Sequence, residues 1–257
     1  MDRVLFDELA GTLTGVADDR APLVLLHGLT FDRRQWAPLL RELGAVDPGR
    51  RVLTLDLPGH GDSPPQPDYR IGTVAELVHR AVTAAGLTAP VLAGHSIGAL
   101  FATDYAARFP ARGVVNVDQP LLPGPFGDLI RGAAPTLRGP DWRTFWDRLQ
   151  DGMGIAALPA DARALVELTS RPRAELLLGY WDEIVHGTDD EVARQRRADL
   201  EAIAARGVDY RWIATSEPAP AYLRWLTGAL PGVEVTVLPG GHFPHLAYPA
   251  ELAKLLA

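Results

Sequence analysis

Residues 93–99 read Ala-Gly-His-Ser-Ile-Gly-Ala, and Ser96 stands in this stretch between Gly94 and Gly98. An apolar run precedes the stretch, and a helical pattern over Ile97–Phe109 follows it. A serine at such a strand-to-helix junction lies on a sharp turn with its hydroxyl above the sheet, and small residues two positions away prevent collisions. A serine that merely caps the helix is the alternative. The motif and its context predict that Ser96 is a nucleophile.

Outward from this motif, apolar runs alternate with helical stretches. Short runs that are apolar on both faces are typical of strands buried inside a parallel sheet. Their alternation with helices predicts an α/β fold, with a mostly parallel sheet covered by helices on both faces. We expect buried strands at Ala21–Leu26, Arg51–Leu55, Ala89–Ala93, Gly113–Val117, Tyr210–Thr215 and Val233–Leu238, and further helices at Trp36–Leu43, Val74–Ala85, Ala221–Leu230 and Ala250–Leu256. A hairpin of Val4–Leu9 and Thr12–Val16, with Gly11 near its turn, is expected before them.

The alternation stops after Asp118. From Leu121 to about Gly207 the sequence has only helical or loop patterns, and prolines mark the entry to this region. We therefore predict a helical cap, residues 121–207, inserted into one core domain of residues 1–120 and 208–257. Its expected helices are Asp141–Gln150, Ala160–Ser170, Ala174–Val185 and Asp189–Arg206. The basic residues at Arg194–Arg197 are expected to form a solvated helix face.

Composition limits the classes of function. The chain has 257 residues, 47% of them hydrophobic, so it can bury a substantial core. A net charge of −7 gives no basic surface for nucleic acid or for an anionic membrane. The absence of cysteine excludes thiolate catalysis and thiolate metal sites. Because Met1–Ala10 has no apolar signal core, we expect a cytoplasmic protein. We expect it to be a monomer or a dimer and to act on a small molecule.

A second glycine-containing loop, Leu26–Leu29, follows another predicted strand. An oxyanion hole needs backbone N–H groups directed at the developing negative charge. The amide of Ile97, at the start of a helix, can supply one donor, and the amide of Leu29 can supply the second. Gly28 would let the backbone approach closely, and His27 is expected to be a packed loop residue.

Four stretches occur in an order that resembles a known family. They are residues 27–29 (HGL), residues 56–63 (DLPGHGDS), the serine motif, and residues 240–246 (GGHFPHL). Together they are similar to the α/β-hydrolase fold family over nearly the whole chain. The resemblance implies a sheet of about eight strands, and a nucleophile, acid and histidine in that chain order. It also implies that the second stretch is a structural turn, so that His60 has a structural role.

The resemblance places the catalytic base on a glycine-rich loop after the last strand, where His242 lies. A histidine there can take the proton of the serine hydroxyl and return it to the leaving group. His95 adjoins Ser96 in the sequence, and its side chain is expected to point into the core. His245 is expected to be structural or to line the pocket.

The acid that orients the histidine is less regular. The family usually has an aspartate after the penultimate strand, but residues 215–218 read Thr-Ser-Glu-Pro. Glu217 stands one position before the expected one, and its longer side chain could compensate. The family's other placement is the end of the strand after the nucleophile helix, where Asp118 lies. We favour Asp118 over Glu217, and both remain candidates.

Aromatic residues are frequent in the predicted cap. At such spacings they pack helices more often than they bind ligands, yet a cap over a site must present apolar surface to the cleft. We expect that the substrate pocket is lined by Thr30, His95, and one or more of Trp142, Trp146 and Trp181.

The sequence thus predicts acyl transfer without a cofactor or a metal ion. Ser96 would attack the carbonyl of a small-to-medium hydrophobic ester or lactone, and His242 would then activate water to release the acid. A carbon–carbon bond hydrolase, a thioesterase and a cofactor-free haloperoxidase could use the same triad. A non-catalytic ligand receptor on this fold is the alternative from another class.

Overall fold

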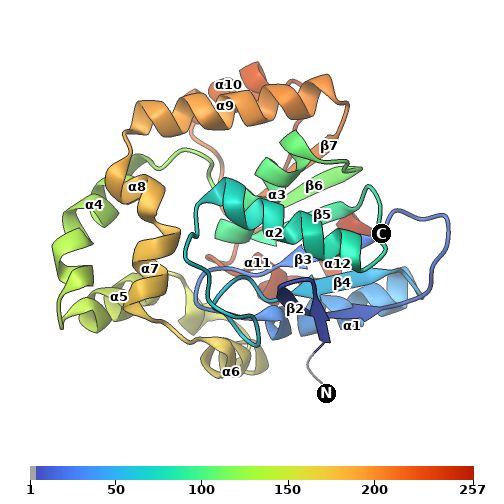
Figure 1. The fold of residues 1–257 in the computed structure, drawn as a ribbon, viewed down its shortest axis with the longest axis horizontal. Coiled ribbons are helices and arrows are strands. Elements are labelled where there is room, and N and C mark those ends of the chain that lie inside the picture. Colours follow the sequence, from blue (N-terminus) through green and yellow to red (C-terminus); the bar gives the residue numbers. More distant parts are fainter. Residues whose placement is uncertain (1–3) are drawn as a thin grey trace.

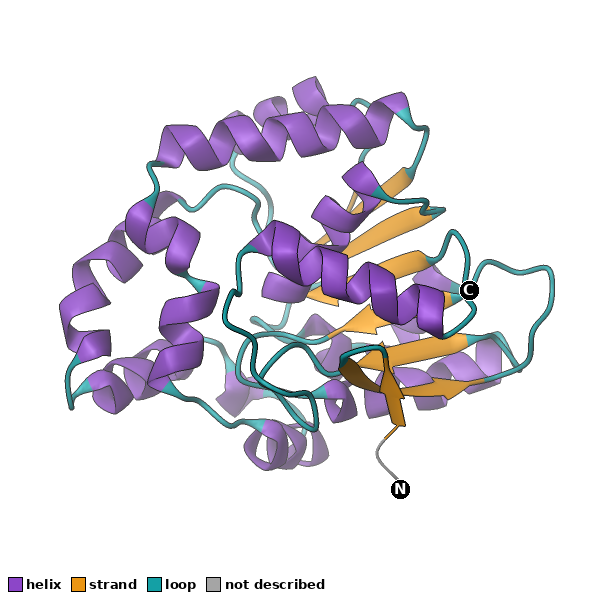
Figure 2. Cartoon of the chain, in the orientation of Figure 1, coloured by secondary structure: helices purple, strands orange, loops and turns teal. Residues whose placement is uncertain are grey.

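The computed structural model describes residues 4–257, and residues 1–3 of the N-terminal stretch considered above lie outside the described part. Within residues 4–257, eight strands form one sheet (Figures 1 and 2). The strands are β1 (Val4–Phe6), β2 (Leu9–Thr14), β3 (Leu23–Leu26), β4 (Val52–Leu55), β5 (Val91–His95), β6 (Gly113–Val117), β7 (Asp209–Ala214) and β8 (Glu234–Val237). The predicted α/β fold with a sheet of about eight strands is confirmed.

The order of the strands is β1-β2-β4-β3-β5-β6-β7-β8. β1 and β2 pair antiparallel with their neighbours, and the six strands from β4 to β8 in this order are parallel to one another. Because the register pairs His95 of β5 with Val117 of β6, the residues that follow them, Ser96 and Asp118, leave the sheet side by side. Ligand sites in such sheets lie at this carboxyl edge.

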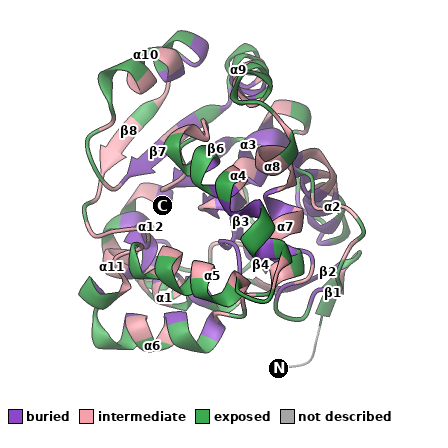
Figure 3. Cartoon of the chain, turned by 90° about the vertical axis from the view of Figure 1, so that its left-hand side faces the viewer, coloured by how far each residue is buried: buried purple, intermediate pink, exposed green. Residues whose placement is uncertain are grey.

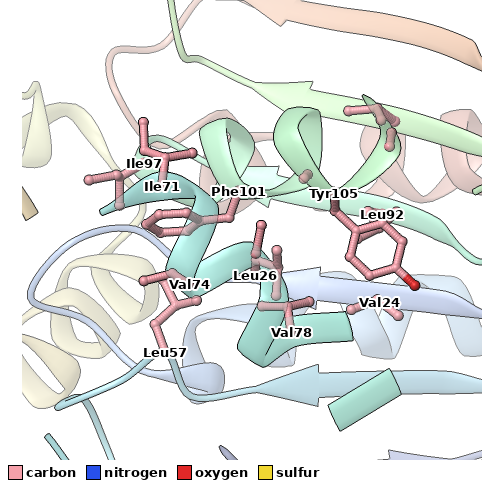
Figure 4. Close-up of a cluster of buried hydrophobic side chains, with 14 of the residues drawn as sticks. Val24, Leu26, Leu57, Ile71, Val74, Val78, Leu92, Ile97, Phe101 and Tyr105 are labelled. Carbon is pink, nitrogen blue, oxygen red and sulfur yellow. The ribbon is translucent and has the colours of Figure 1, made fainter. Parts of the chain in front are cut away.

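Helices cover both faces of the sheet, as predicted. The core helices are α1 (Ala37–Val46), α2 (Ile71–Ala84), α3 (Ile97–Arg108), α10 (Pro220–Ala229), α11 (Pro244–Ala247) and α12 (Pro249–Leu256). α2 and α3 pack on one face, whereas α1 and α12 pack on the other. Figure 4 shows how side chains one helical turn apart, Phe101 and Tyr105, face Val74 and Val78 of α2. Burying a side chain such as Phe101 stabilises the fold by about 1.5–3 kcal/mol.

The N-terminal hairpin differs from its prediction. The turn lies at Asp7 and Glu8, where Asp7 has a φ of 54°, and Gly11 lies inside β2. Gly11 is needed for a different reason, because a Cβ atom there would lie 2.8 Å from the carbonyl oxygen of Thr54 on the neighbouring β4. The glycine therefore marks a close approach of two strands rather than a turn.

The turn between β5 and α3 is as crowded as the sequence motif indicates. A Cβ atom on Gly94 would lie 2.3 Å from the carbonyl carbon of Gly98, and one on Gly98 would lie 2.5 Å from the carbonyl oxygen of Leu26. Both glycines are thus fixed by the backbone around them, which no side-chain movement can relieve.

Residues 121–207 form helices and loops beside the carboxyl edge of the sheet (Figure 1). The helices are α4 (Gly124–Arg138), α5 (Trp142–Asp151), α6 (Ala160–Thr169), α7 (Ala174–Tyr180), α8 (Asp182–His186) and α9 (Asp189–Ala205), with a short 3-10 turn, η2 (Ile155–Ala157). Much of α5 and α6 is exposed (Figure 3). α9 instead packs along α3 of the core.

Two features of this region depart from the sequence prediction. α4 was not expected, because Pro120, Pro123 and Pro125 were interpreted as marking the entry to this region. Pro125 occupies the first turn of α4, where the missing N–H costs nothing. The helix expected over Ala174–Val185 is divided at Trp181, whose backbone separates α7 from α8. Among the helices of residues 4–257, none is long and apolar enough to cross a bilayer.

We predict that Gly94→Ala lowers the free energy of unfolding by about 1–3 kcal/mol or more, because the new methyl group overlaps backbone atoms of α3. Gly44→Ala is the matched control: Gly44 lies in α1, with open space around it, and alanine there should stabilise by about 0.5–1 kcal/mol. Urea denaturation measures both changes. Equal stability of the Gly94 variant and the wild type would contradict the close packing of this turn.

Candidate active site

A cavity of about 750 Å³ opens at the carboxyl edge of the sheet. Most of the residues that the sequence pointed to line it, and they come from the core and from residues 121–207 alike. They are Leu29, His95, Ser96, Ile97, Asp118, Trp146, Trp181, Glu217 and His242. The structure therefore brings the candidate nucleophile, base and both candidate acids to one space.

Ser96 stands at the turn between β5 and α3. Its backbone has φ 52° and ψ −130°, a conformation that is strained for a residue with a side chain. The turn is held because the N–H of Ser96 donates to the carbonyl of Val117 at 2.9 Å, while the carbonyl of Ser96 accepts from Ala99 at 2.8 Å. Strain at this position is typical of a serine nucleophile on this kind of turn.

Two buried histidines fix the loop that carries Leu29. His27 donates through Nδ1 to the carbonyl of Gly28 at 2.7 Å and accepts from Leu57 N–H at Nε2. His60 accepts the N–H of Thr30 at 3.0 Å through Nε2. Burial lowers the pKa of both imidazoles, most strongly that of His60, so each stays neutral and keeps its acceptor nitrogen. His27 and His60 thus have the structural roles expected for them.

This arrangement leaves two backbone donors at the cavity wall. Within the part of the chain that the structure describes, neither Leu29 N–H nor Ile97 N–H has a hydrogen-bond partner. Ile97 is the first residue of α3, so the positive end of the helix dipole lies there as well. These are the two amides that the sequence suggested for an oxyanion hole.

Asp118 lies within hydrogen-bonding distance of His242. The Nδ1–H of His242 donates to Oδ2 of Asp118 at 2.8 Å, and Oδ1 of Asp118 accepts the hydroxyl of Thr215 at 2.7 Å. The backbone of Asp118 has a φ of 56°, which turns its side chain out of the strand direction. Glu217 is exposed on the cavity rim and forms no hydrogen bond to a described residue.

The main chain of His242 is held from two sides. Its N–H donates to the carbonyl of Met153 at 3.0 Å, and its carbonyl accepts from Nε2 of His95 at 2.6 Å. The proton of His95 is therefore on Nε2, because a carbonyl can only accept. Burial, with the neighbouring His245, holds the pKa of His95 well below its usual value. Sequence reasoning did not find these contacts, nor the one from Thr215, since all join distant segments.

His245 is fully buried between His95 and Trp36, with ring centroids 4.2 Å and 4.9 Å away. Burial, with the neighbouring His242, lowers the pKa of His245 to about 3. The ring is thus neutral near pH 7, and His245 does not line the cavity.

Ser96 and His242 face the same cavity, but no hydrogen bond between their side chains is present among residues 4–257. Such bonds often shorten only when substrate binds. The histidine–aspartate contact, by contrast, is already formed in the empty cavity.

The cavity walls are mostly apolar, and the aromatic residues divide. Trp146 and Trp181 line the cavity, with ring centroids 6.5 Å apart. Trp142 does not line the cavity; it is half-buried against the hydrophobic core, with Arg143 over its ring. Thr30 does not line the cavity either, and it is fully buried. Sequence reasoning did not anticipate that Trp212 and Tyr222 would also line the cavity.

This chain is similar to known proteins both in sequence and in structure. A putative carbamate hydrolase of Escherichia coli is 33% identical over 101 residues, which is 38% of this chain and 37% of that protein. The curated relatives that head the comparison are matched over less than two fifths of their own length.

Among the solved structures that share the fold, two illustrate the similarity. A variant of AqdC, described in complex with the Pseudomonas quinolone signal whose ring it cleaves, superposes with a TM-score of 0.79 at 20% identity, covering 96% of this chain and 93% of that one. The enol-lactonase of Burkholderia xenovorans superposes with a TM-score of 0.67 at 21% identity, over 96% and 94%. The model of the alpha/beta hydrolase family matches residues 23–255, and this chain therefore belongs to that family.

Proposed function

We propose that this protein is a serine hydrolase that cleaves a carboxylic ester or lactone of a small-to-medium hydrophobic substrate. The observation that carries the proposal is the 2.8 Å contact of His242 Nδ1 with Asp118, beside Ser96 and two unpartnered backbone amides in one cavity. The carboxylate keeps the proton on Nδ1, so that Nε2 is free to accept the proton of a serine hydroxyl.

In this mechanism Ser96 Oγ attacks the substrate carbonyl and His242 takes its proton. The amides of Leu29 and Ile97 stabilise the oxyanion, and the protonated His242 gives its proton to the leaving alcohol. Water, deprotonated by His242, then attacks the acyl-enzyme, and the acid leaves as Ser96 regains its proton. Asp118 stabilises the imidazolium at both stages, and Thr215 holds Asp118 in place.

The side chains that line the cavity support a hydrophobic substrate. Apolar and aromatic side chains dominate the lining, which favours a hydrophobic acyl or alcohol group. The structural similarity to an enol-lactonase is consistent with an ester bond inside a ring. Thioesters and carbon–carbon bonds remain alternatives for the same triad.

Proton abstraction by the His242–Asp118 pair, without serine attack, is a second candidate. One observation favours it: the pair is formed, whereas Ser96 and His242 share no hydrogen bond within residues 4–257. The similar AqdC is described as carrying out ring-cleavage of the Pseudomonas quinolone signal. A ligand receptor without catalysis would need neither the pair nor the free amides.

We also propose that residues 121–207 act as the cap over this cavity. They supply Trp146 and Trp181 to its wall, and Met153 contacts the main chain of His242. α9 packs along the core helix α3, which would anchor this end of the cap to the core.

A fluorophosphonate probe should label the wild-type protein and leave Ser96→Ala unlabelled, because the probe reacts only with an activated serine. Ser216→Ala is the matched control, since Ser216 lines the same cavity and should keep full labelling. Intact-mass spectrometry measures the adduct. Labelling that persists in Ser96→Ala, or an unlabelled wild type at neutral pH, would contradict the proposal, and turnover without Ser96 would favour the second candidate.

Asp118→Asn should lower kcat by about 10⁴, because the amide leaves His242 in the wrong tautomer. Glu217→Gln should change kcat by only a few-fold, because Glu217 is exposed and forms no bond to His242. Steady-state kinetics on an activated ester measure both. The reverse pattern would assign the acid to Glu217.

A further inference from the structure

Arg196 departs from its sequence prediction in a way that bears on substrate recognition. It belongs to the basic run expected on a solvated helix face, yet it is 2% exposed and lines the cavity. Its Nη1 donates to Asp199 at 2.8 Å, and its Nη2 donates to Glu183 at 2.9 Å. Nε is buried and has no partner among the described residues.

Arg196 reaches the cavity from α9, the helix that packs along α3 behind the nucleophile turn. α9 packs on α3, where Arg196 is close enough to Asp104 to oppose the rise in pKa that burial causes in that carboxyl. Asp104 follows Ile97 by two turns of α3, which is about 10 Å along the helix axis. Leu100, one turn of α3 after Ser96, also lines the cavity.

The stability of the fold alone does not explain why the charge of Arg196 is buried here. Apolar residues of similar volume often replace a buried ion pair without loss of stability, whereas a buried N–H without a partner is unfavourable. In an otherwise apolar cavity, a donor of this kind is complementary to an acceptor on a ligand.

The charges around Arg196 limit what that ligand group can be. The Arg196 guanidinium pairs with two carboxylates, Glu183 and Asp199. Asp104 lies nearby and pairs with Arg108, so the three carboxylates and two guanidinium groups together carry a net negative charge. A carboxylate on the ligand would be repelled by Glu183 and Asp199. A cation would be opposed by the guanidinium, and it would leave Nε without an acceptor. A neutral group that both accepts and donates hydrogen bonds is complementary to the guanidinium and to Glu183 together.

We propose that Arg196 and Glu183 bind a neutral primary amide, or a group of the same hydrogen-bonding kind, about 10 Å from the carbonyl that Ser96 attacks. Its oxygen accepts from Arg196, and its NH₂ donates to Glu183. The part of the substrate between the two ends is apolar, in contact with residues such as Leu100, Ile184 and Val192. This inference rests on the proposed function for the identity of the reacting end.

The first test compares activated esters whose acyl chains, graded in length, end in a methyl group, a primary amide, a carboxylate or an ammonium group. At the matching length we expect kcat/KM for the amide to exceed that for the methyl ester at least tenfold, because a site built to hydrogen-bond a substrate group discriminates against an analogue that lacks it. In Arg196→Met and in Glu183→Gln this ratio should fall towards one. Within each variant both esters react with the same Ser96, so the ratio of their kcat/KM values reports on the end group alone.

Arg197→Met is the matched control. Arg197 is the next residue of α9. Its side chain is 43% exposed and, among residues 4–257, pairs only with Glu201, and it does not line the cavity. Its amide-to-methyl ratio should equal that of the wild type. An equal kcat/KM for amide and methyl esters at all lengths, or a preference for the carboxylate or the ammonium ester, would overturn the proposal.

A binding measurement separates this inference from the proposed function. Octanamide, octanoate and octylammonium can be titrated into Ser96→Ala, with the fluorescence of Trp146 and Trp181 as the signal. We expect octanamide to bind at least tenfold more tightly than either ion, and Glu183→Gln in the same background to remove the difference. Failure of all ester hydrolysis with this preference intact would refute only the hydrolase. Equal binding of the three probes would refute only the amide site.

Discussion

The close approach of β5, α3 and β3 at Gly94 and Gly98 is the constraint on which the site depends. A Cβ atom on Gly94 would lie 2.3 Å from a backbone atom, and one on Gly98 would lie 2.5 Å from another. Only glycine therefore fits at these two positions, between which the chain turns from β5 into α3. Ser96 then takes a strained conformation with a positive φ, and α3 begins with its first amide directed to the cavity. The position of the nucleophile and one oxyanion donor thus follow from the same turn.

The rest of the site is assembled by the sheet register and by buried imidazoles. β6 runs beside β5, which brings Asp118 next to Ser96, and the positive φ of Asp118 directs its carboxylate to His242. Neutral His60 accepts the Thr30 N–H next to Leu29, whose own amide has no partner within residues 4–257, and neutral His95 donates to the His242 carbonyl. Burial keeps these imidazoles uncharged, so the scaffold does not depend on their titration near pH 7.

Much of the fold was predictable because its signals are local. Apolar runs located six of the strands, and the serine motif located the turn. Contacts between distant segments were not predictable: the choice between Asp118 and Glu217 depends on where two loops meet in space. Arg196 was assigned to solvent because the pattern of α9 does not reveal that its inner face lies over a cavity. α4 was missed because prolines in a first turn resemble those of a loop.

Proton NMR of the imidazole N–H groups in histidine-labelled protein tests most directly whether His242 donates a hydrogen bond to Asp118. A hydrogen bond from Nδ1 of His242 to a carboxylate protects this proton from exchange and shifts its resonance downfield. We expect such a resonance that is lost in His242→Gln and in Asp118→Asn but kept in Glu217→Gln. A resonance that survives Asp118→Asn and disappears in Glu217→Gln would contradict this expectation.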